Sequence, residues 1–88
     1  MTETERFLAE RIEYVRKQLA ICVADAQESC ERIRAFLADE QGARGVVPPP
    51  TGRANDLAGA GARAKELCGT LRELVDAQAM LRYDLERK

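Results

Sequence analysis

Two stretches of this chain carry the same seven-residue apolar repeat, and a Pro-Pro-Pro segment separates them. Each stretch has nine core slots spaced alternately three and four residues apart, and eight of the nine hold an apolar residue. A repeat sustained over more than three heptads is typical of helices that pack as a coiled coil. The slots of the first stretch are Leu8, Ile12, Val15, Leu19, Cys22, Ala26, Ser29, Ile33 and Phe36. Those of the second are Leu57, Ala60, Ala64, Leu67, Leu71, Leu74, Gln78, Leu81 and Leu85.

Residues at the edges of the two repeats predict where each helix begins. Thr2 and Glu5 form a capping-box pattern, and no Gly or Pro follows until Gly42, so we expect a first helix from about residue 3 to 40. Asn55 is a suitable N-cap for a second helix that reaches about residue 87. This helix meets the end of the sequence without a Gly or Pro terminator, as expected if the chain is part of a longer protein.

The segment from about residue 41 to 54 is predicted to be a loop. Its three prolines oppose helix and favour a stiff, extended backbone, and Gly42 or Gly45 can adopt the left-handed conformation that ends a helix. A Pro-rich segment can also be a ligand for SH3-type domains, but no flanking specificity motif supports that role. We therefore interpret the segment as a connector within a single domain of residues 1–88.

A loop of this length predicts that the two helices fold back on each other. It spans at most about 45 Å, which is too short to return the chain to the start of a parallel partner. The prediction is an all-α, antiparallel two-helix coiled-coil hairpin, in which slots whose numbers sum to about 93 face each other, such as Ile33 with Ala60 and Glu5 with Lys88. Gln78 either fixes this register or lies near a hydrated end of the pair.

One flank of the predicted seam is apolar and the other is polar. With the heptad positions lettered a to g and the core slots at a and d, the e positions include apolar residues near the loop. We call this set the e flank: Val23, Cys30, Leu37, Cys68 and Val75. An apolar face wider than a two-stranded seam suits a bundle of more helices, so we expect the e flank to be an oligomer interface in a four-helix bundle.

A second apolar set repeats every seven residues at c positions of the first helix: Phe7, Tyr14 and Ile21. We call it the terminal stripe. Three large apolar side chains in a row on a helix surface commonly mark a contact site, although scattered surface hydrophobes are the plainer interpretation. We predict that the terminal stripe binds a partner protein.

Composition excludes several classes of function. The chain has 14 basic and 15 acidic residues, so it lacks the basic excess of a nucleic-acid-binding domain, and no apolar run is long enough for a membrane span. The polar, acidic first residues are unlike a signal peptide. Three cysteines without metal-site or disulfide spacing are expected to be small buried hydrophobes, with a redox or interchain role as the minor alternative. An intracellular location follows, in the cytoplasm or the nucleus.

No constellation for catalysis is present in the sequence. The chain has no His and a single Ser, so nucleophile–base pairs are difficult to assemble, and we expect no enzyme activity, metal, cofactor or small-molecule substrate. Gly59 to Ala64 match a loose G-x-G-x-x-A dinucleotide pattern, but no strand precedes them.

The sequence therefore predicts a protein–protein interaction domain that self-associates, most simply into a homodimer. A two-helix unit of this size has a small margin of stability alone, and small scaffolds commonly gain stability by forming oligomers. Two alternatives stay open: an obligate subunit of a complex with a different helical protein, and a small effector-binding hairpin that recognises a GTPase or a similar partner.

Overall fold

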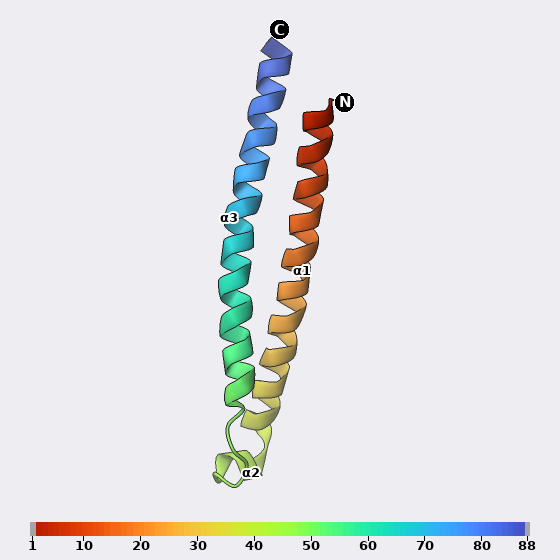
Figure 1. Cartoon of the computed structure of the whole chain (residues 1–88). Coiled ribbons are helices and arrows are strands. Elements are labelled where there is room, and N and C mark those ends of the chain that lie inside the picture. The colour runs from red at the N-terminus through yellow and green to blue at the C-terminus, as the bar shows by residue number, and fades with distance from the viewer. Residues whose placement is uncertain (1, 88) are drawn as a thin grey trace.

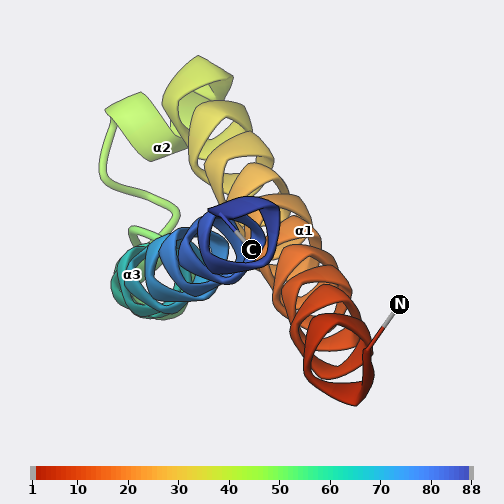
Figure 2. The same cartoon turned by 90° about the horizontal axis from the view of Figure 1, so that it is seen from above.

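The protein is an antiparallel helical hairpin. A computed structural model describes residues 2–87, which form the long helices α1 (Glu3–Ala38) and α3 (Thr51–Arg87) and the one-turn helix α2 (Glu40–Ala43) between them. The two long helices lie side by side, and the described ends of the chain both lie at the end opposite the loop (Figure 1). Seen from that end, α1 and α3 are inclined to each other, as expected for coiled-coil packing (Figure 2). The predicted all-α hairpin is confirmed.

Helix α1 begins with the predicted capping box. The backbone N–H of Glu5 donates to Thr2 Oγ1 at 3.1 Å, and the backbone N–H of Thr2 donates to Glu5 Oε1 at 3.2 Å. The helix ends at Ala38, two residues earlier than predicted, because Asp39 has extended backbone angles and accepts a hydrogen bond from Gln41 N at 2.9 Å. A side chain that caps a new helix competes with continuation of the old one.

Helix α3 begins at Thr51, four residues before the predicted start, so the loop is shorter than expected. The first helical hydrogen bond runs from Ala54 N to Pro50 O at 3.1 Å. Proline suits this junction because the first-turn amides of a helix need no intrahelical partner and the fixed φ of proline already matches the helix. Asn55 consequently lies inside α3 rather than at its cap, and Gly45, with φ of 73°, is the left-handed glycine of the loop.

The predicted seam is the core of the molecule. All nine slots of α1 are buried or half-buried, and Val15, Cys22 and Ser29, at successive d positions, are 2%, 4% and 2% exposed. In α3 the slots from Leu57 to Leu81 are half-buried, whereas Leu85 is 43% exposed. The heptad pattern therefore identified the correct face of both helices.

The predicted register is wrong by about one heptad. Arg53 Nη1 lies 3.7 Å from Glu28 Oε1, and Arg63 Nη2 donates to Gln18 Oε1 at 3.3 Å. Both contacts lie twelve positions from the predicted register, and they join long side chains that reach along the helices. Ala54, which lines one hollow with Ile33, and Arg82, whose charge acts on Glu5, place each residue of α3 opposite an α1 residue about seven positions earlier than expected. Ala60 accordingly lies near Cys22 and not near Ile33.

The shift follows from the early start of α3, which removes residues from the loop. It also explains Leu85, because the end of α3 extends past the start of α1 (Figure 1). The expected pairing of Glu5 with Lys88 lies outside the described residues, and Arg82 is the α3 residue whose charge acts on Glu5.

The register can be tested by cross-linking from the native Cys22. In a Cys30→Ser/Cys68→Ser background, Ala64→Cys should form an intramolecular disulfide with Cys22 on mild oxidation, because the observed register places these slots opposite each other. Leu71→Cys, which the sequence-based register would place opposite Cys22, should stay reduced. Non-reducing electrophoresis and thiol counting measure both, and a disulfide in the Leu71→Cys chain alone would contradict the observed register.

The capping box predicts a pH dependence of stability. Hydrogen bonds from the backbone and then the side chain of Thr2, with a smaller effect of Arg82, lower the pKa of Glu5 in the folded chain. A lowered folded pKa gives stability that is present above the unfolded pKa and is lost as pH falls through the folded pKa. The stability difference between wild type and Glu5→Gln, measured by urea unfolding, should therefore be present at pH 7 and absent in strong acid.

The cap also predicts the effect of removing the Thr2 hydroxyl. At pH 7, Thr2→Ala should lower the free energy of unfolding by about 1 kcal/mol, and Thr4→Ala, which lies outside the cap, should lower it much less.

Candidate interaction surfaces

The e flank and the terminal stripe lie on opposite sides of the plane that contains the two helices. Heptad positions e and b follow the seam on one side of each helix, and positions g and c follow it on the other side. A pair of helices covers only the seam, so both sides stay open to solvent. The structure thus provides two separate surfaces, each of which carries one of the predicted contact sets.

The e flank is open along most of its length. Val23, Leu37 and Val75 are between 45% and 71% exposed, Cys68 is exposed, and Cys30 is half-buried. The register shift staggers the two helices, so the apolar residues of α3 lie closer to the chain termini than those of α1. The e flank is therefore a diagonal strip across the pair, and its role as an oligomer interface stays a prediction.

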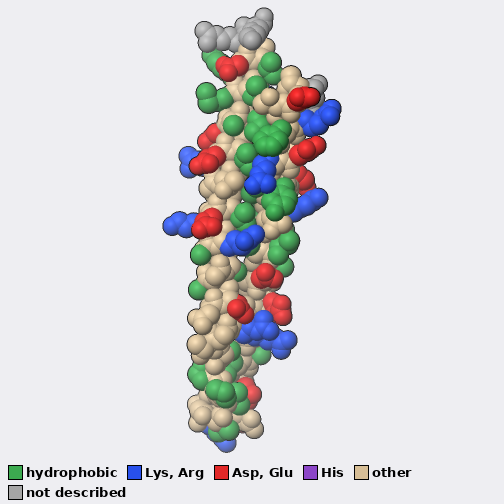
Figure 3. Space-filling view, in the orientation of Figure 1, with side chains coloured by type: hydrophobic (Ala, Val, Ile, Leu, Met, Phe, Trp, Pro, Cys, Tyr) green, Lys and Arg blue, Asp and Glu red, His purple; other side chains and the backbone are tan. Residues whose placement is uncertain are grey.

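The terminal stripe is equally open. Phe7, Tyr14 and Ile21 are between 50% and 63% exposed, and the Arg11 guanidinium lies 5.0 Å from the centre of the Tyr14 ring, in cation–π range. Green side chains form a broken line along the upper half of α1, with charged ones between them (Figure 3). Its role in binding a partner also stays a prediction.

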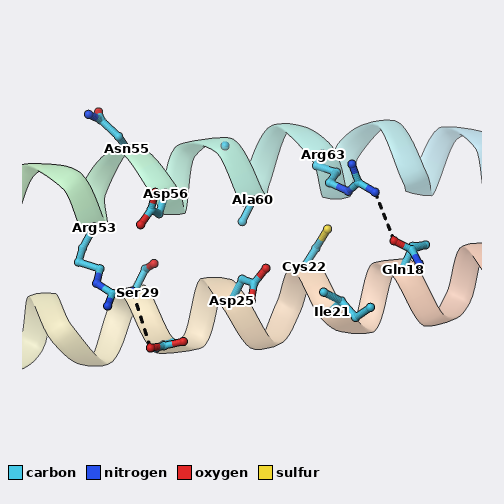
Figure 4. A pocket seen from close by; sticks show the side chains of 12 residues that line it. Gln18, Ile21, Cys22, Asp25, Ser29, Arg53, Asn55, Asp56, Ala60 and Arg63 are labelled. Atoms are coloured by element: carbon cyan, nitrogen blue, oxygen red, sulfur yellow. Dashed lines mark hydrogen bonds and ion pairs between the residues drawn. The ribbon is translucent and has the colours of Figure 1, made fainter.

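A groove continues from the terminal stripe toward the loop. It has a volume of about 590 Å³ and lies between α1 and α3, with Ile21 at its edge and the small residues Ser29, Gly59 and Ala60 among those that line it. Asp25 and Asp56 lie in the space between the helices, whereas Asn55 points away from it (Figure 4).

Two interhelix contacts cross this groove: the Arg53–Glu28 ion pair and the Arg63–Gln18 hydrogen bond (Figure 4). The groove was not predicted from the sequence, because Arg53 was assigned to the loop and the register was displaced. Arg53 lies four residues before Leu57 and so continues the heptad repeat by one d position. This spacing was the signal that could have placed Arg53 on the seam.

The groove combines small residues with charged and amide side chains. Its Ser29 hydroxyl has no His nearby, since the chain contains none, and its other polar groups are three carboxylates, two guanidinium groups and two amides. Within residues 2–87, no three His, Cys, Asp or Glu side chains converge as a metal site. Among the same residues, no helix combines the length and apolar character needed to cross a membrane.

Comparisons of the chain with protein-family models, curated proteins and solved structures found no match.

The groove predicts the effect of adding a side chain at Gly59. A Cβ at this position would meet nothing within 4 Å, so Gly59→Ala should raise the free energy of unfolding by about 1 kcal/mol through helix propensity alone. At Gly42 a Cβ would lie 2.7 Å from the backbone oxygen of Phe36, so Gly42→Ala should lower it. Urea unfolding of the two variants in dilute solution measures both, and a loss of stability in Gly59→Ala would show that the groove is occupied or closed.

Proposed function

We propose that this chain is a self-association domain: a helical hairpin whose e flank packs against another hairpin to form a bundle of four or more helices. The observation that carries the proposal is the exposed surface. The hairpin exposes 7024 Å², whereas a compact 9.8 kDa monomer is expected to expose about 5,200 Å². The excess is roughly 1,800 Å² per chain.

An excess of this size matches what association would cover. Obligate homodimers bury about 2,000–5,000 Å² in total, or about 1,000–2,500 Å² per chain. The elongated shape also supports association, because it leaves the long sides of the hairpin open to another chain. The radius of gyration is 20.0 Å, whereas a compact domain of this length is expected to have about 12 Å.

The thin core supports association for an energetic reason. Among the described residues only Val15, Cys22 and Ser29 are fully buried, and one of these three is polar. Burial of Val23, Leu37 and Val75 by another hairpin would add apolar contacts where the isolated chain has solvent, at about 25 cal/mol per Å² covered. Cys22, Cys30 and Cys68 are free thiols, which suits a reducing compartment such as the cytoplasm.

The terminal stripe favours a second role in binding a different protein. Its three exposed apolar residues and the Arg11–Tyr14 contact lie on the other side of the helix pair, so a partner could bind there while the e flank is occupied. A partner for this stripe would be a GTPase-like protein recognised by the hairpin, whereas a different helical subunit would pack on the wide apolar face of the e flank.

Light scattering on wild type and on Val23→Asp/Val75→Asp tests the proposal. We expect a wild-type mass of two or more chains and a fall to the single-chain mass in the variant, because the introduced carboxylates would be desolvated in the contact. Val46→Asp is the matched control, since Val46 is exposed but lies in the loop away from the e flank. A stable wild-type monomer would overturn self-association and direct attention to a heterologous partner.

A further inference from the structure

Helix α3 carries opposite charges on its two open sides. Lys65 and Arg72 are at b positions, on the side of the e flank, and Glu66 and Glu73 are at c positions, on the side of the groove. The two Lys/Arg–Glu dipeptides are one heptad apart and all four side chains are exposed. None of them takes part in an ion pair within residues 2–87.

The same polarity extends over both helices. In residues 3–86 the side that carries the e flank has two acidic residues at its b and e positions, Glu13 and Glu86, and six basic ones: Arg6, Arg16, Arg34, Lys65, Arg72 and Arg82. We call this side the basic face. The opposite side, called the acidic face, has six acidic residues at the c and g positions of residues 3–38 and 51–86: Asp25, Glu28, Asp56, Glu66, Glu73 and Asp84. The basic residues at these positions are Arg11, Arg32 and Arg63, and Arg53 lies in an adjoining d slot.

This polarity bears on which surface can cover the e flank. A two-fold symmetric contact between e flanks would place one basic face against another, and like charges across an interface oppose association. The acidic face has the complementary sign, and it also carries the apolar terminal stripe. A surface of complementary charge to the basic face is thus present on the chain itself. Its apolar terminal stripe lies nearer the chain termini than Val23, Cys30 and Leu37 do.

We propose that the e flank of one hairpin packs on the acidic face of a second copy that points in the same direction. The inference rests on the proposed self-association and names the surface that the e flank binds. With the two copies stacked in register, Lys65 of one chain lies beside Glu66 of the next, and Arg72 lies beside Glu73. The contact covers the e flank of one copy and the terminal stripe of the other, so the copy at one end of the stack keeps a terminal stripe open to a different protein.

Such a contact is heterologous, because the two copies use different surfaces. The stack keeps a free basic face at one end and a free acidic face at the other, so further copies can add until the stack closes into a ring or continues as a filament. A symmetric dimer would instead stop at two chains.

Charge reversal on one face at a time tests the contact. Lys65→Glu/Arg72→Glu removes the net positive charge of the basic face and places acidic side chains where the next copy presents Glu66 and Glu73. Glu66→Lys/Glu73→Lys makes both faces basic. Each variant alone should associate at least about tenfold more weakly than wild type, whereas an equimolar mixture of the two should regain wild-type association. The fourfold exchange of both pairs restores opposite faces at the original net charge and should also associate. Sedimentation velocity at low ionic strength measures each case, because salt screens exposed pairs.

A control and circular dichroism make the outcomes decisive. Ala24→Lys/Ala62→Lys/Asp76→Lys changes the net charge as much as Glu66→Lys/Glu73→Lys does, but its residues are exposed at f positions on the outer edges of α1 and α3, and it should leave association unchanged. All variants should keep wild-type helicity. A wild-type chain that is monomeric overturns the proposed function together with this contact. If wild type forms only dimers and Glu66→Lys/Glu73→Lys associates as strongly as wild type, the proposed function is retained and this contact is overturned.

Discussion

Two helices can enclose only the line of side chains that faces both of them, and every other property of this hairpin depends on that constraint. The enclosed line contains few bulky side chains. Cys22 and Ser29 occupy central d slots next to Val15 in sequence, and Ala60 and Ala64 fill two slots of α3 near the loop. A seam of this kind holds the helices close together but removes little apolar surface from water. Much of the apolar surface therefore lies on the two open sides.

The heptad repeat predicted which face of each helix is enclosed, and it could not predict the register. A repeat of seven is unchanged by a shift of seven, so Leu67 fits opposite Leu19 as well as Leu74 does. What decided between the two registers was the junction at Pro50, where α3 starts directly after the proline triplet. Arg53 then lies within the helix and pairs with Glu28, and Leu85 is left beyond the end of α1. The register therefore depends on where α3 begins. The preference of Asn for the N-cap position predicted a start at Asn55, four residues too late.

The candidate surfaces were predictable to different degrees. The e flank and the terminal stripe follow from helical periodicity, and their exposure in the structure agrees with it. The groove does not follow from periodicity, because it needs the true register to bring Asp25 and Asp56 together. The polarity of charge between the two sides was present in the sequence, but it becomes meaningful only when a folded hairpin separates b from c positions. In an assembly, such polarity would select orientation and partner, while the apolar strips would supply the affinity.

The most direct measurement of whether association stabilises this fold is thermal unfolding, followed by circular dichroism over a roughly hundredfold range of chain concentration. If another hairpin covers the open sides, folding is coupled to association, and the midpoint temperature rises steadily with concentration. A midpoint that does not change across the range, in a chain that stays monomeric and folded, would contradict the claim. The seam of Val15, Cys22 and Ser29 would then be sufficient on its own.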